Sequence, residues 1–180
     1  MNRVGVAVAL AACLSSCAAT SSNAAIEAGD AGPVLDALTA DASEPELDLG
    51  TGEPGQFVRV SDGQTVLLQR GCQGAQHIFF SLRSRGVRID TPAWITLSVS
   101  RESDGRVVSS AYSLRLMVTS TSDGVGVLTG LTPVIEEPSD VLGQWVVMEA
   151  LMEDGARAQR ASARRRVMVR WGPDSCRPHG

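Results

Sequence analysis

From Phe57 onward, apolar and polar residues alternate along this chain, and Asp-Gly pairs interrupt the alternation. An alternating run predicts a β-strand with one buried face, and Asp-Gly between two such runs is the strongest short-range signal for a hairpin. No long stretch has helical periodicity. The pattern predicts about eight strands, at residues 57–60, 65–70, 76–83, 94–101, 106–118, 125–131, 144–153 and 156–171.

The buried faces of three predicted strands follow directly from the alternation, because side chains two residues apart share a face. We expect these faces to be Ile78, Phe80 and Leu82; Ile95, Leu97 and Val99; and Tyr112, Leu114, Leu116 and Val118. Short, regularly spaced strands with one polar face favour an antiparallel sandwich over a parallel sheet. The expected fold is therefore all-β, a β-sandwich of roughly 7–8 strands over residues 55–180.

The last two predicted strands can be paired in register. If Asp154-Gly155 forms a two-residue turn, three cross-strand pairs follow. They are Glu153 with Ala156, Glu149 with Arg160, and Trp145 with Arg164. The other face is then apolar and belongs to the core, with Val146, Met148, Ala150, Met152, Ala161, Ala163, Val167, Val169 and Trp171. Arg165 interrupts that face, which a β-bulge or a sheet edge would explain.

The amino terminus has the pattern of a targeting segment. Arg3 supplies a positive charge, and residues 4–14 are almost wholly apolar. As a helix, this run would rise roughly 16 Å, about half of a bilayer core of ~30 Å, so it is too short to span a membrane. Its length is typical of the apolar region of a signal peptide.

The segment ends in Leu14-Ser15-Ser16-Cys17, which resembles the lipobox of bacterial lipoproteins. The resemblance implies that residues 1–16 are removed and that Cys17 becomes a lipid-bearing amino terminus. Leu10-Ala11-Ala12-Cys13 is an overlapping second match, and an ordinary secretory signal cut near Ala18-Ala19 is the other alternative. Ala18 stands where an inner-membrane retention signal would place Asp, so the resemblance implies an outer-membrane location.

Residues 17–54 differ in composition from the sandwich. After Cys17 they include acids but no bases and no aromatic residue, and they are rich in Ala, Ser and Gly. Such a segment buries too little apolar surface to offset the entropy of ordering, so we expect a flexible acidic linker. The formal net charge is −4, and the arginines are spread along the sandwich instead of forming one patch. This distribution argues against a nucleic-acid partner.

Cys72 and Cys176 are the cysteines that remain if Cys17 is lipidated. An exported compartment is oxidising, so we expect a disulfide that joins the start of the sandwich to its end. Two free or buried thiols are the alternative. A catalytic Cys72 near His77 would need a third, orienting group, and the sequence identifies none.

The segment 71–77 is the strongest local candidate for a binding site, because glycines, amides and a histidine open a predicted strand. The residues that could contact a ligand are Gln73, Gln76, His77 and, from elsewhere, Trp94. The alternative is structural, a tight turn with a hydrogen-bonded His77. No metal or cofactor is expected, because His77 and His179 are the only histidines and no C-x-x-C or H-x-x-x-H spacing occurs.

The sandwich resembles the immunoglobulin-like and fibronectin III-like modules of exported bacterial proteins. The G-x-Q-G-x-x-H pattern at 71–77 is similar to segments of exported lipoproteins without an established activity. A tethered sandwich without a catalytic set favours a non-catalytic module for adhesion, scaffolding or envelope assembly, anchored by its lipid. A small-ligand or glycan-binding lipoprotein is the alternative, and an enzyme built around His77 is the third hypothesis. The sequence has no G-x-S-x-G motif and no phosphate-binding glycine loop.

Overall fold

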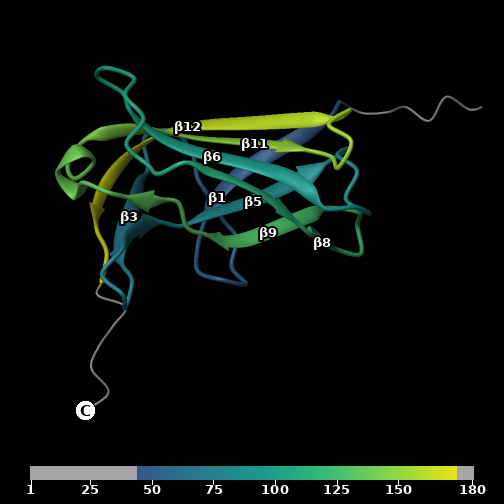
Figure 1. Ribbon diagram of the computed structural model, residues 1–180, viewed down its shortest axis with the longest axis horizontal. Coiled ribbons are helices and arrows are strands. Elements are labelled where there is room, and N and C mark those ends of the chain that lie inside the picture. Colours follow the sequence, from purple (N-terminus) through teal and green to yellow (C-terminus); the bar gives the residue numbers. More distant parts are fainter. Residues whose placement is uncertain (1–43, 174–180) are drawn as a thin grey trace, which may run out of the picture. The chain divides into compact units, whose positions relative to one another are not determined.

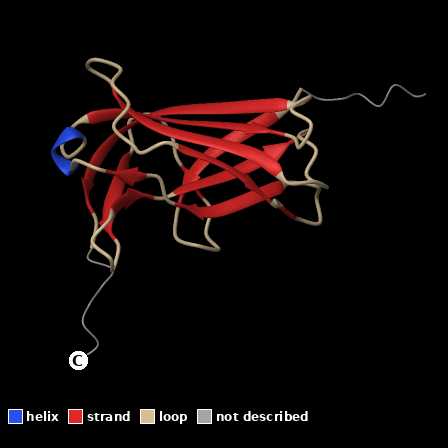
Figure 2. Ribbon diagram, viewed as in Figure 1, coloured by secondary structure: helices blue, strands red, loops and turns tan. Residues whose placement is uncertain are grey.

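Two β-sheets packed face to face account for residues 44–173, the part of the chain that this computed structural model describes (Figures 1 and 2). Sheet A has the order β2-β1-β5-β9-β8 and contains β1 (Glu46–Thr51), β2 (Val58–Arg59), β5 (Phe80–Arg85), β8 (Thr119–Ser120) and β9 (Gly126–Leu131). Sheet B has the order β10-β4-β3-β12-β11-β6-β7 and contains β3 (Thr65–Arg70), β4 (Gln76–Ile78), β6 (Ala93–Arg101), β7 (Tyr112–Leu116), β10 (Val134–Ile135), β11 (Trp145–Glu153) and β12 (Arg160–Trp171). A short 3-10 helix, Pro138–Asp140, lies between β10 and β11. The predicted all-β sandwich is confirmed.

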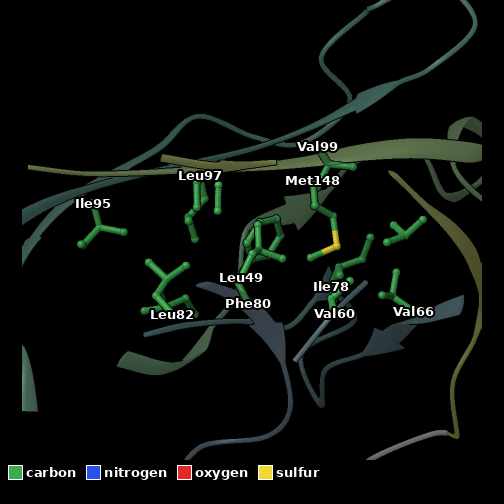
Figure 3. Packing of buried hydrophobic residues seen from close by; sticks show 14 of the residues in the cluster. Leu49, Val60, Val66, Ile78, Phe80, Leu82, Ile95, Leu97, Val99 and Met148 are labelled. Atoms are coloured by element: carbon green, nitrogen blue, oxygen red, sulfur yellow. The ribbon is translucent and has the colours of Figure 1, made fainter. Parts of the chain in front are cut away.

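The core lies between the two sheets and follows the alternation of the strands. Figure 3 shows buried side chains from both sheets. Leu49, Phe80 and Leu82 come from sheet A, and Ile95, Leu97 and Met148 come from sheet B. The predicted faces at 78–82 and 95–99 are confirmed, since their apolar residues are all buried. The face predicted at 106–118 is confirmed only in part. Val118 is buried, but Leu114 is 44% exposed because β7 is the edge strand of sheet B.

The strand predicted at 76–83 is divided between the two sheets. Its first part, β4, pairs with β3 and β10 in sheet B, whereas its second part, β5, pairs with β1 and β9 in sheet A. The chain changes sheet at Phe79, whose carbonyl accepts a hydrogen bond of 3.0 Å from Oγ1 of Thr51. The segment that pairs with β4 and β5 also changes sheet, because its strand β9 belongs to sheet A and its strand β10 belongs to sheet B. Strands that switch sheets in this way form the corner of a sandwich.

The sandwich begins earlier than the sequence predicted. Strand β1 falls inside the expected linker 17–54, yet it lies between β2 and β5 and buries Leu49 completely. A methyl group at Gly50 would lie 2.8 Å from Cε2 of Phe57, so the bare glycine admits that ring against the strand. The linker boundary at Gly55 is therefore wrong. Residues 1–43, which hold Cys17, the predicted signal peptide and the rest of the predicted linker, lie outside the described residues.

The register predicted for the last hairpin is also wrong, by four residues. Glu153 pairs with Arg160, and Glu149 pairs with Arg164, because a six-residue loop replaces the two-residue turn. The buried carboxylate of Asp154 organises this loop by accepting hydrogen bonds from the amides of Ala158 and Gln159. An even shift leaves each side chain on its predicted face, so the predicted core positions are buried. Trp171 is the exception, at 46% exposure beyond the end of the sandwich.

One strand pairing is parallel, contrary to the antiparallel sandwich expected. Strand β3 pairs in parallel with the end of β12, from Met168 to Trp171. Before Met168, β12 has β11 on one side and no strand on the other. Arg165 lies in that open half, and its Nε donates to the carbonyl oxygen of Val60 at 3.1 Å. Of the two explanations for Arg165, the sheet edge is the one observed, because the β11–β12 register is continuous.

Candidate functional site

His77, the leading sequence candidate, lies on β4 and packs over the turn that precedes this strand. Its ring contacts Phe79 edge-on, with 4.8 Å between the ring centroids. The amide of Gly71 donates to the carbonyl oxygen of Ala75 at 2.7 Å and closes the turn. A side chain at Gly71 would meet Cε1 of His77 at 3.4 Å, so the ring lies over the turn. These contacts support the structural alternative for segment 71–77.

Burial lowers the pKa of His77 below 6.5, and a hydrogen bond with the backbone of Ala75 acts in the opposite direction. The folded protein therefore binds a proton at His77 less readily than the unfolded chain does. The stabilising contribution of the neutral ring is complete above pH 6.5 and is lost as the pH falls through the folded-state pKa. We expect an NMR titration of the His77 ring to have its midpoint below 6.5. A midpoint at or above the value of the urea-unfolded chain would contradict this burial.

The structure does not bring the predicted contact residues together. His77 and Gln76 lie on β4, Gln73 lies in the exposed turn before it, and Trp94 lies on β6. Three strands, β3, β12 and β11, separate β4 from β6 in sheet B. Cys72 lies in the same turn as Gln73, but Cys176 lies outside the described residues, so their pairing stays a prediction. His77 and Trp94 therefore do not share one site, and a ligand contact at either residue stays a prediction.

Arginine side chains cover the tryptophan rings. The guanidinium of Arg157 lies 4.6 Å from the ring of Trp94, and that of Arg166 lies 3.7 Å from the ring of Trp145. The ring of Trp171 has Arg70 at 5.6 Å. Each tryptophan thus has a cation–π partner within the protein. This arrangement weighs against a glycan site built on bare aromatic faces.

A groove on the outer face of sheet A is the site that sequence reasoning missed. Its volume is about 150 Å³. The residues that line it are mostly charged: Glu46, Asp48, Arg59, Arg83, Arg85, Thr121, Asp123 and Val125. They come from β1, β2, β5 and the turn between β8 and β9, and β1, β5 and β9 lie side by side in sheet A (Figure 1). Because Leu82 and Ser84 face the core, the intervening Arg83 and the next residue, Arg85, face outward.

The register of β1 and β5 places acids opposite bases in this groove. Glu46 is the cross-strand partner of Arg85, and Asp48 is that of Arg83. The sequence carries a signal for this site, since acids alternate with leucines at 46–49 and arginines alternate with serine at 83–85. The linker-like composition around residues 46–51 masks this signal.

Two of the three carboxylates in the groove have partners. Asp48 forms an ion pair with Arg59, and Asp123 accepts a hydrogen bond from the Thr121 hydroxyl. The Thr121 hydrogen bond is the main cause that lowers the pKa of Asp123 below its usual value, and the charges of Arg85 and Arg83 act in the same direction. The carboxylate of Asp123 is therefore ionised at neutral pH.

Three other charges in the groove have no such partner. Within residues 44–173, the guanidinium groups of Arg83 and Arg85 and the carboxylate of Glu46 form no ion pair and no side-chain hydrogen bond. Arg83 lies over the ring of Phe57, with its Cζ 4.6 Å from the ring centroid. The groove thus presents two basic groups whose hydrogen-bond donors are available.

Comparison with protein-family models, curated proteins and solved structures found no match to this chain. The described residues contain no helix long and apolar enough to cross a membrane. They also contain no cluster of three or more His, Cys, Asp or Glu side chains arranged to hold a metal ion. The groove and the amino-terminal sequence are therefore the features from which a function can be inferred.

Proposed function

We propose that this chain is a lipid-anchored protein of the bacterial cell envelope that binds a partner and has no catalytic activity. The observation that carries the binding role is the groove on sheet A, a hollow lined almost entirely by charged side chains. A fixed β-sheet floor holds those side chains at defined spacings, which is what selective recognition of a charged partner needs.

The place of action follows from the amino terminus. The lipobox-like Leu14-Ser15-Ser16-Cys17 supports lipid attachment at Cys17. A thioether-linked diacylglycerol supplies two acyl chains, and two chains are enough for stable attachment at about 0.8 kcal/mol per buried CH₂. With Ala18 after it, we place the anchor in the outer membrane. The compartment is oxidising, and we include a Cys72–Cys176 disulfide in the proposal.

The alternative of a small-ligand or glycan-binding lipoprotein uses the same anchor. Its aromatic version is weakened by the arginines over Trp94 and Trp145. An enzyme built on His77 is disfavoured by the packing of that ring against Phe79 and over the turn at Gly71. Partner binding through the groove remains the function that the geometry supports best.

The test is crosslinking in intact cells, followed by purification of the protein from detergent-solubilised membranes. We expect mass spectrometry to find an acylated Cys17 as the first residue, and a crosslinked partner that disappears in Arg83→Glu/Arg85→Glu. The matched control is Arg160→Glu/Arg164→Glu, which makes the same charge change on the outer face of sheet B.

Two results would refute the proposal. An unprocessed chain in the cytosol would remove the anchor and the compartment together. A partner captured equally by the wild type and by both double variants would remove the groove from the binding role. Circular dichroism of each purified variant separates a lost interaction from a lost fold.

A further inference from the structure

We infer that the groove of sheet A binds an oxyanion group, such as a phosphoryl or carboxylate group, through Arg83 and Arg85. This inference rests on the proposed function, because it names the chemistry that the partner presents to the groove. Its foundation is the juxtaposition, in a hollow of about 150 Å³, of two outward guanidinium groups that have no acceptor among residues 44–173.

The spacing of the two arginines suits one shared anion. They are two positions apart on β5, so their Cα atoms are about 6.6 Å apart on one face of the strand. Each guanidinium carries about five N–H donors in a planar fork that matches carboxylate and phosphate oxygens. An oxyanion between the two side chains can accept charged hydrogen bonds from both.

Neighbouring groups hold this pair ready for a ligand. The ring of Phe57 supports Arg83 from below, which limits the conformations of that side chain without using its N–H groups. Arg59 neutralises Asp48, the acid opposite Arg83 in the register. The carboxylate of Asp123 accepts a hydrogen bond from Thr121, and the charges of Arg85 and Arg83 also act on it. Within residues 44–173, neither Asp48 nor Asp123 accepts a hydrogen bond from Arg83.

Several other surface arginines of the sandwich differ in this respect. Arg164 faces Glu149 at 3.4 Å, and Arg166 faces Glu102 at 2.5 Å. Arg101 pairs with both Asp104 and Asp140. Their donors are directed to carboxylates of the protein itself. An anion bound there would first have to displace an ion pair, which Arg83 and Arg85 do not require.

Glu46 sets a limit on the ligand. It is opposite Arg85 and repels an anion, so the groove suits a compact oxyanion group better than a densely charged polyanion. Substituting Glu46→Gln removes one like charge beside the site. We therefore expect this variant to bind oxyanions about two- to fivefold more tightly, a change opposite in sign to that of the arginine variants.

The experiment is a titration of the purified, lipidated protein in detergent with inorganic phosphate and, separately, with acetate, followed by NMR of the arginine Nε–H groups. We expect saturable shifts at Arg83 and Arg85. In Arg83→Gln/Arg85→Gln the affinity should fall at least about tenfold, as lost charged hydrogen bonds require. In the control Arg160→Gln/Arg164→Gln the affinity should be unchanged.

The two probes distinguish the source of the group. Binding of phosphate without acetate assigns the site to phosphoryl groups, and binding of both assigns it to oxyanions in general; either result supports the inference. The inference would be overturned if neither phosphate nor acetate bound saturably, or if the wild type and Arg83→Gln/Arg85→Gln bound with equal affinity. If the groove still governed crosslinking in cells, the proposed function would stand and the oxyanion chemistry alone would fall.

Discussion

A chain that begins at Gly55 is expected not to fold, whereas one that begins at Ala40 is expected to fold. The shorter chain lacks β1, which buries Leu49 completely and Leu47 to 8% exposure. Each buried leucine contributes roughly 1.5–3 kcal/mol of transfer free energy, and the lost β1–β5 ladder leaves β5 with an open edge. Against a total stability of about 5–15 kcal/mol, this loss is decisive. Urea unfolding followed by circular dichroism measures it.

The chain that begins at Ala40 is the matched control, because it retains every described strand. A second control keeps the full length and replaces both leucines, Leu47→Ser and Leu49→Ser. We expect it to be destabilised like the shorter chain, although it has the same number of residues. If the chain from Gly55 unfolded cooperatively at the same urea concentration as the control, β1 would be dispensable and the boundary at Gly55 would stand.

The fold class was predictable from sequence because the sandwich depends on a local property, the alternation of side chains along a strand. The face of Ile95, Leu97 and Val99 was read correctly, and so was the face of Met148 and Val167. Register was not predictable. The Asp154-Gly155 pair indicates a short turn, but the carboxylate of Asp154 instead holds a longer loop through hydrogen bonds to residues that follow it.

Strand β1 was missed because its signal is short and its surroundings are misleading. Leu47 and Leu49 alternate with Glu46 and Asp48, but proline, glycine and acidic residues surround them, as in a linker. What orders β1 is non-local, since its residues pair with residues of β5 that lie 31 to 39 positions later, and also with β2. Local composition carries no signal of such pairing.

The candidate site was missed for the same reason. The groove draws residues from β1, β2, β5 and the turn between β8 and β9, and only the pairing of the sheet brings Glu46 opposite Arg85. His77, in contrast, stood out locally because glycines surround it, yet those glycines serve the turn. The aromatic contacts of the arginines also depend on tertiary structure, since Arg166 lies over Trp145 and Arg83 lies over Phe57.

The substitution Phe80→Ala is expected to lower the free energy of unfolding by about 3–5 kcal/mol, the range for removing a large buried aromatic side chain. Phe80 is fully buried and is among the largest side chains of the core. It lies just after the point where the chain passes from sheet B to sheet A, and its ring lies in the core between the two sheets (Figure 3). The surrounding strands belong to two paired sheets and cannot collapse into the vacated volume. Urea unfolding of the wild type and the variant gives the difference directly.

Leu67→Ala is the matched control, because Leu67 lies on β3 with 41% of its surface exposed and faces away from the core. We expect this substitution to lower the free energy of unfolding by less than about 1 kcal/mol. Phe80→Leu keeps an apolar side chain of smaller volume, so its loss of unfolding free energy should lie between those of Leu67→Ala and Phe80→Ala. A loss below about 1 kcal/mol for Phe80→Ala would mean that the corner repacks or that the ring is not enclosed. If the free energy of unfolding instead decreases in the order wild type, Leu67→Ala, Phe80→Leu, Phe80→Ala, stability depends on filling the volume near the point where the chain leaves one sheet for the other.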